Sequence, residues 1–176
     1  TGKTAAFGLP LLDLIDSNDS HVQALIMAPT RELGQQTAKQ LTEFAGNQRK
    51  LNVECVYGGA NIATQIRALQ RPTQILVATP GRLLDLMKRK AVSLKDVKYV
   101  VLDEADEMLQ MGFKEDIDDI LSHTPDDRVT WLFSATMPKD IRKLVNKYMS
   151  NPKEVSVMTE QKTNQDITHQ YVITQV

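Results

Sequence analysis

Tyr99-Val100-Val101-Leu102-Asp103-Glu104-Ala105-Asp106 places three carboxylates directly after an apolar run. The run is continuous rather than alternating, which is typical of a strand buried on both faces of a parallel sheet. Similar runs occur at residues 25–28 (LIMA), 75–78 (ILVA) and 131–133 (WLF). Adjacent carboxylates at the end of a buried strand are costly unless a cation or a proton compensates their charge. The stretch therefore predicts a strand that leads from a hydrophobic core to a charged site.

Apolar runs and amphipathic patterns alternate along the chain. Alternating strands and helices are typical of βαβ units, in which helices cover both faces of a parallel sheet. The sequence therefore predicts an α/β fold with three layers, αβα, and a mainly parallel central sheet. We expect strands at 21–28, 52–56, 74–78, 97–102, 129–133 and 154–157, and helices at 4–15, 31–45, 81–90, 113–121 and 138–149.

Composition excludes several classes of protein. The 176 residues are 41% hydrophobic and 24% charged, with a net charge of -1, so the chain is not a generally basic nucleic-acid coat. The single cysteine, Cys55, excludes an internal disulfide and fits a reducing compartment. No apolar run approaches the roughly 18 residues of a membrane span, and no secretory signal opens the chain. We expect a monomer without membrane contacts, cytoplasmic or, in a eukaryote, nuclear.

Gly2-Lys3-Thr4 matches the end of the phosphate-loop pattern G-x-x-x-x-G-K-[ST]. In that pattern, N–H groups at a helix N-terminus cradle phosphates, the Lys reaches the β- and γ-phosphates, and the Thr hydroxyl ligates Mg²⁺. Asp103 would then hold Mg²⁺ through water, and Glu104 would orient or deprotonate the attacking water. The combination predicts an ATP-hydrolysing site. The alternatives are an incidental turn and an acidic cluster at a helix N-terminus.

Ser134-Ala135-Thr136 follows the expected strand at 129–133. We expect its two hydroxyl groups to lie beside the acidic site and to hydrogen-bond Asp106. Such a link could transmit the state of the nucleotide to the substrate side. The alternative for Thr136 is a helix cap.

Three further segments have the character of phosphate-backbone binders. Pro29-Thr30-Arg31-Glu32-Leu33 and Thr79-Pro80-Gly81-Arg82 each bring an Arg and a Thr to a helix N-terminus. Gly58-Gly59 permits close approach of the backbone to a ligand. Each segment alone is a common turn. Together they would lie beyond the carboxyl ends of the strands, where open α/β sheets bind ligands, and contact phosphates and sugars without reading bases.

The order GKT, PTREL, GG, TPGR, DEAD, SAT resembles the DEAD-box family of ATP-dependent RNA helicases. The resemblance runs from Gly2 to about Val157, and EMLQMGF at 107–113 is similar to the family's continuation after its acidic motif. It implies a RecA-like first domain in an RNA-dependent ATPase. The implied roles are phosphate and Mg²⁺ binding by Lys3 and Thr4, metal and water contacts by Asp103 and Glu104, coupling by Ser134 and Thr136, and RNA-backbone contacts near Thr30, Arg31, Gly59, Thr79 and Arg82.

The family also has parts that this sequence does not contain: the adenine-reading glutamine segment, the first half of the phosphate loop and the second RecA-like domain. We therefore expect residues 1–157 to be RecA-like domain 1, starting within the phosphate loop. Residues 158–176 would be a linker and a candidate first strand of domain 2. Because family members close both domains around ATP and RNA, this polypeptide alone is expected to be inactive or nearly so.

Two other functions remain open at this point. One is a non-catalytic scaffold that binds RNA or a partner protein, and the other is a related superfamily-2 translocase acting on DNA. Retention of Lys3, Asp103 and Glu104 together speaks against a scaffold. Asp106 and the PTREL and TPGR pair favour RNA over DNA.

Overall fold

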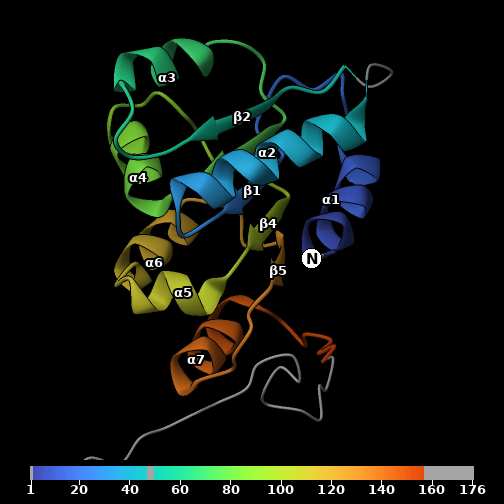
Figure 1. Cartoon of the computed structure of the whole chain (residues 1–176), viewed down its shortest axis with the longest axis vertical. Helices are drawn as coiled ribbons and strands as arrows, with labels where there is room; N and C mark the ends of the chain where they lie inside the picture. The colour runs from blue at the N-terminus through green and yellow to red at the C-terminus, as the bar shows by residue number, and fades with distance from the viewer. Residues whose placement is uncertain (1, 47–49, 157–176) are drawn as a thin grey trace, which may run out of the picture.

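Five parallel strands form the centre of the computed structural model, which describes residues 2–46 and 50–156 (Figure 1). They lie in the order β2-β3-β1-β4-β5, and every neighbouring pair is parallel. The parallel sheet and five of the expected strands are confirmed, with narrower bounds. The strands are β1 (Ala24–Met27), β2 (Val53–Val56), β3 (Ile75–Ala78), β4 (Tyr99–Leu102) and β5 (Val129–Leu132).

The strand expected at 154–157 is wrong for residues 154–156, which belong to no strand. Val155 is 91% exposed, so its side chain has no core to enter. An alternating apolar run becomes a strand only where a neighbour can take its backbone hydrogen bonds. Val157 and the linker and strand expected over 158–176 lie outside the described residues.

Helices cover both faces of the sheet, as Figure 1 shows. The expected helices are all present within one or two residues. Two short helices, α3 and α5, were not expected from the sequence. The helices are α1 (Lys3–Leu14), α2 (Arg31–Ala45), α3 (Ile62–Ala68), α4 (Pro80–Lys88), α5 (Ala105–Gln110), α6 (Lys114–Ser122) and α7 (Lys139–Tyr148).

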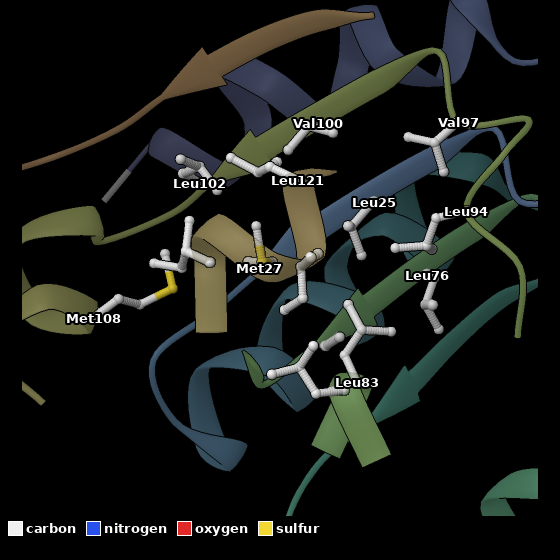
Figure 2. Packing of buried hydrophobic residues seen from close by; sticks show 14 of the residues in the cluster. Leu25, Met27, Leu76, Leu83, Leu94, Val97, Val100, Leu102, Met108 and Leu121 are labelled. Atoms are coloured by element: carbon white, nitrogen blue, oxygen red, sulfur yellow. The ribbon is translucent and has the colours of Figure 1, made fainter. Parts of the chain in front are cut away.

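Successive strand side chains point to opposite faces of the sheet. The core therefore consists of two hydrophobic clusters, one between the sheet and the helices on each face. In β1, Ile26 packs with α1 and α2 on one face, whereas Leu25 and Met27 pack with α4, α5 and α6 on the other. Figure 2 shows the second cluster, in which Met27 and Leu102 lie near Met108. The central strands β1 and β3 are buried at every position, which explains their continuous apolar sequence.

No helix in the described ranges 2–46 and 50–156 is long and apolar enough to cross a membrane. The cytoplasmic location stays a prediction.

Candidate functional site

The register of the sheet brings the expected functional segments to one edge. The last residues of β1, β3 and β4 are direct partners, since Met27 pairs with both Ala78 and Leu102. β2 and β5 end level with them, as Val56 pairs with Ala78 and Leu102 with Leu132. The loops that follow all five strands therefore leave the sheet at its carboxyl edge, where α/β proteins bind ligands.

Lys3 joins this edge from the first turn of α1. Its Nζ lies 3.1 Å from Oε1 of Glu104, and both side chains are about one-third exposed, at 37% and 32%. Gly2 is the N-cap of α1 and makes no side-chain cap. Among the described residues, no atom lies within 4 Å of a Cβ built on Gly2. The arrangement can accept an anionic group.

Asp103 is the most buried carboxylate of the edge, with 2% of its surface exposed. Its Oδ1 has no hydrogen-bond partner among the described residues. Burial, and then the nearby Glu104 carboxylate, raises the pKa of Asp103, although the Lys3 ammonium and the backbone N–H of Glu104 act the other way. A buried carboxylate oxygen without a partner is a suitable ligand for a hard cation such as Mg²⁺.

Within residues 2–46 and 50–156, no cluster of three or more His, Cys, Asp or Glu side chains is placed to hold a metal. Thr4 is half-buried in the first turn of α1, next to Lys3.

Glu104 has a left-handed backbone, with φ 51° and ψ 51°. This conformation costs a non-glycine residue about 1–2 kcal/mol, and such strain clusters at functional sites. The turn is held by the Ala105 N–H, which donates to the Phe133 carbonyl at 3.0 Å. α5 then begins at Ala105.

The acidic cluster is also partly a helix N-terminus. Asp106 and Glu107 stand in the first turn of α5, where negative charge is favoured. The alternative drawn from the sequence thus describes these two residues locally, while Asp103 precedes the helix.

Asp106 connects α5 to the segment after β5. The Thr136 hydroxyl donates to Oδ2 of Asp106 at 2.8 Å, and the Thr136 N–H donates to the same oxygen at 3.0 Å. Partial burial opposes ionisation, but the hydrogen bonds from Thr136 outweigh it, so the pKa of Asp106 lies below its usual value. Thr136 is not a helix cap, because Pro138 is the N-cap of α7.

Ser134 stabilises the segment that carries Thr136. Its hydroxyl donates to the Thr136 carbonyl at 2.7 Å and so fixes the turn that presents Thr136.

Two of the segments expected to bind a phosphate backbone lie at helix N-termini. Thr30 is the N-cap of α2, and its hydroxyl accepts from the Leu33 N–H at 3.3 Å. Arg31 is exposed and lies over the Tyr57 ring, 4.8 Å from its centre. Thr79 precedes α4 without capping it by its side chain, and Gly81 is exposed in the first turn. These residues leave polar groups at the carboxyl edge.

The glycine loop and Arg82 complete the edge. Gly58 and Gly59 are exposed, and Gly59 has a φ of 80° that favours glycine. Arg82 points toward protein groups: Nη1 donates to Gln65 Oε1 at 2.9 Å and Nη2 to the Ala60 carbonyl at 3.0 Å. Two of its N–H groups are therefore engaged inside the protein.

Comparison with known proteins agrees with this geometry. Residues 1–144 match a family model described as DEAD/DEAH box helicase. This chain belongs to that family. The DEAD-box resemblance drawn from the motifs is thereby confirmed. Because the solved structures of DEAD-box proteins share the fold, the RecA-like αβα class is confirmed as well.

Curated relatives in the helicase family cover nearly all of this chain. An ATP-dependent RNA helicase CshA from Limosilactobacillus reuteri is 49% identical over 98% of the chain and 34% of its own length. The RNA helicase CrhR of Synechocystis is 51% identical over 97% of the chain and 34% of its own length. A crystal structure of a DEAD box protein from Methanococcus jannaschii superposes with a TM-score of 0.81 and 46% identity, over 86% of this chain and 41% of that one. The chain thus spans about a third of the length of these curated relatives.

The structure adds residues to this DEAD/DEAH box site that the motifs did not indicate. Glu107 is exposed in the first turn of α5, and the neighbouring Glu104 side chain raises the pKa of Glu107. Tyr57 and Gln65 contact the arginines of the edge. The position of Glu107 three residues after Glu104 was a weak signal. The contacts of Tyr57 and Gln65 join separate segments, so no local pattern could show them.

Proposed function

We propose that this chain is the N-terminal RecA-like domain of a DEAD-box RNA helicase, an RNA-dependent ATPase. It binds Mg-ATP and the RNA backbone, and couples ATP hydrolysis to local unwinding of an RNA duplex. The observation that carries the proposal is the meeting of Lys3, Asp103 and Glu104 at the edge where Thr136 bonds Asp106. The printed names of the relatives, ATP-dependent RNA helicase among them, support it.

The nucleotide side uses α1 and the acidic turn. Gly2 and Lys3 bind phosphate groups, and Thr4 with Asp103 holds Mg²⁺. The fit rests on the buried Asp103 oxygen without a partner and on the Lys3 ammonium beside it. Bound Mg²⁺ supplies positive charge that offsets the charge on the transferring phosphoryl group.

Glu104 is the residue that orients the attacking water and accepts its proton. Lys3 holds the Glu104 carboxylate at 3.1 Å. Partly exposed ion pairs of this kind contribute only about 0–1 kcal/mol. Lys3 can therefore exchange the carboxylate for a phosphate group at small cost, which leaves Glu104 available for water.

The coupling side uses Asp106, Ser134 and Thr136. Asp106 follows Glu104 by two residues, so a shift of the acidic turn moves the Thr136 segment through their two hydrogen bonds. Ser134 keeps that segment rigid. This link carries the state of the nucleotide toward bound RNA.

RNA contacts come from Thr30, Arg31, Gly58-Gly59, Thr79 and Gly81, with Arg82 behind them. They bind the sugar-phosphate backbone without reading sequence. A second RecA-like domain of the same protein completes both sites. We propose domain 1 for residues 1–157 and a connection to domain 2 for residues 158–176.

The test measures ATP hydrolysis by the full-length protein that carries this chain, with and without single-stranded RNA. Wild type is expected to be stimulated by RNA, and Glu104→Gln to lose at least about a hundredfold in rate. RNA binding in the presence of an ATP analogue serves as the control, since Glu104→Gln should retain it. An unchanged rate in Glu104→Gln contradicts the role of Glu104. Equal stimulation by single-stranded DNA contradicts the assignment to RNA.

A further inference from the structure

The loop from Tyr57 to Ala60 has little to hold it in shape. Its two central residues are Gly58 and Gly59, and a Cβ on either would meet no atom within 4 Å. Gly58 and Gly59 form a hydrogen-bonded turn between Tyr57 and Ala60, and within the described chain the N–H groups of the two glycines donate to no protein acceptor. Glycine also loses more conformational freedom on ordering than other residues. Contacts that fix the two ends of this loop reduce the entropy that its glycines lose when their N–H groups meet a phosphate.

Gln65 fixes one end of this loop and reaches toward the other. Its Nε2 donates to the Tyr57 carbonyl at 3.1 Å, and its Oε1 accepts from Nη1 of Arg82 at 2.9 Å. Arg82 then donates from Nη2 to the Ala60 carbonyl at 3.0 Å. The two side chains thus bracket the glycines, with one carbonyl held before them and one after.

Because Gln65 is buried, loss of these hydrogen bonds would be costly. Only 7% of its surface is exposed, and a buried amide is costly unless its donor and acceptor are both satisfied. The orientation of the amide is fixed by its partners, because a reversed amide would direct N–H groups at the guanidinium of Arg82.

Tyr57 extends the bracket to the N-terminus of α2. Its hydroxyl accepts from Nε2 of Gln35 at 2.9 Å, and its ring lies under the Arg31 guanidinium at 4.8 Å. Arg31 in turn donates from Nε to Gln35 Oε1 at 3.4 Å. The three segments assigned to RNA are therefore joined by Gln35, Tyr57 and Gln65.

We propose that Gln65 is a positioning residue for RNA, which holds the Tyr57–Ala60 loop and Arg82 in the arrangement that receives a phosphate backbone. The inference rests on the proposed function and deepens it. A loop ordered before binding loses less entropy when the ligand arrives, so the arrangement strengthens RNA binding. Arg82 stabilises the loop through its hydrogen bonds to the Ala60 carbonyl and to Gln65.

The experiment compares three variants of the full-length protein. Gln65→Met keeps the length of the side chain and removes both hydrogen bonds. Gln65→Glu keeps an acceptor for Arg82 and removes the donor to the Tyr57 carbonyl. The matched control is Gln74→Met. Gln74 is 3% exposed and also makes two bonds, to the Asn52 N–H and the Asp19 carbonyl, but it precedes β3 at the opposite end of the sheet.

The measurements are the Kd for a fluorescein-labelled oligouridylate, the KM for RNA and kcat in RNA-stimulated ATP hydrolysis, and Tm. Gln65→Met is expected to raise the KM for RNA and the Kd about tenfold, equivalent to about 1.4 kcal/mol. Gln65→Glu should raise both by a smaller factor. For both variants, kcat at saturating RNA should change by less than about twofold. Gln74→Met should lower Tm without changing the KM for RNA.

Two results would contradict the proposals, and they are distinguishable. If Gln65→Met and Gln65→Glu keep the wild-type KM for RNA, or change it no more than Gln74→Met at a similar loss of Tm, Gln65 has only a structural role. If wild type neither binds RNA nor is stimulated by it, the proposed function fails and the role of Gln65 fails with it.

Discussion

Asp103→Asn tests whether the buried charge of Asp103, on the proposed nucleotide side of the site, lowers the stability of the domain. The substitution keeps the shape of the side chain and removes its charge. Asp103 is almost fully buried, and its Oδ1 has no partner among the described residues. Removal of a buried charge whose Oδ1 lacks a partner should therefore stabilise the domain in the absence of ligands.

The size of the gain follows from the surroundings of Asp103. A buried polar atom without a hydrogen bond costs about 1–3 kcal/mol, and more when it is charged. Asparagine still leaves a polar atom at this position, and the variant also loses the attraction of Lys3. We therefore expect a net gain of about 1 kcal/mol at neutral pH, or about 2–4 °C in Tm for a domain of this size.

The gain should depend on pH in a definite direction. Burial raises the pKa of Asp103 above its unfolded value of 3.8, so the protonated carboxyl stabilises the fold at low pH. That contribution is complete below the unfolded pKa and is lost as the pH rises through the raised folded pKa. The advantage of Asp103→Asn is therefore largest at neutral pH and shrinks as the pH falls toward 3.8.

Asp106→Asn is the matched control, because the pKa of Asp106 is shifted the other way. Hydrogen bonds from Thr136 outweigh partial burial and lower its pKa. The stabilising contribution of ionised Asp106 is present above the unfolded pKa and is lost as the pH falls through the lowered folded pKa. Asp106→Asn should destabilise the domain by about 1 kcal/mol at neutral pH, and the loss should fade in acid.

The assay is thermal unfolding of both variants and wild type over a pH series, with EDTA present and nucleotide absent. Opposite signs for the two variants at neutral pH support the reasoning. A lower Tm for Asp103→Asn at neutral pH, or a gain that does not change with pH, would refute the view that burial dominates at Asp103.

Three further outcomes follow from the geometry. Glu104→Gly should be up to about 1 kcal/mol more stable than Glu104→Ala, because glycine adopts the left-handed backbone without strain. At the exposed Gln36 in α2, the glycine variant should instead be the less stable one. Melting curves of both pairs of variants test this. Thr136→Val should lower stability by about 1 kcal/mol at neutral pH, since a hydroxyl bond to Asp106 is lost, and should reduce duplex unwinding per ATP hydrolysed in the full-length protein. Burial raises the pKa of Cys55 to about 12 from 9.0, so alkylation of the native thiol should be about a thousandfold slower than in guanidinium, as timed labelling would show.

The sequence predicted the sheet well because its strands are buried on both faces. Runs such as ILVA at β3 are stable only when both faces are buried. Because all five strands are parallel, the loops that follow them leave the sheet at the same edge. The helix α3 was missed because seven residues hold too little periodicity, although Asn61, which caps it with bonds to two N–H groups, was a usable signal. The strand expected at 154–157 is wrong for residues 154–156, because strand pairing depends on a neighbouring strand and not on the run itself.

The site was predictable where chemistry follows from adjacent residues. Asp103 and Glu104 stand next to each other after a buried strand, and together with Gly2-Lys3-Thr4 they indicated a charged site at this edge. The roles assigned to them stay predictions. The bracket around Gly58 and Gly59 was not predictable, because Gln65 and Arg82 are 17 positions apart and their bond exists only in the folded sheet. The sequence also could not show that Arg31 and Arg82 differ in exposure. Arg31 is exposed to solvent, whereas Arg82 donates to groups of the protein.

The two sides of the carboxyl edge differ in how completely they are satisfied. On the nucleotide side, the buried Asp103 oxygen lacks a partner and Glu104 holds a strained backbone, both within one turn. On the RNA side, Gln65 and Arg82 satisfy each other and the loop carbonyls. Natural sequences break local rules mainly where a ligand completes the structure. If the proposed sites hold, Mg-ATP would bind at a turn with a strained residue and an unpartnered oxygen, whereas RNA would bind a surface whose side chains are already satisfied. Asp106 and Thr136 are joined by a hydrogen bond next to this turn, so under the proposed coupling a change in the turn would move the Thr136 segment without breaking that bond.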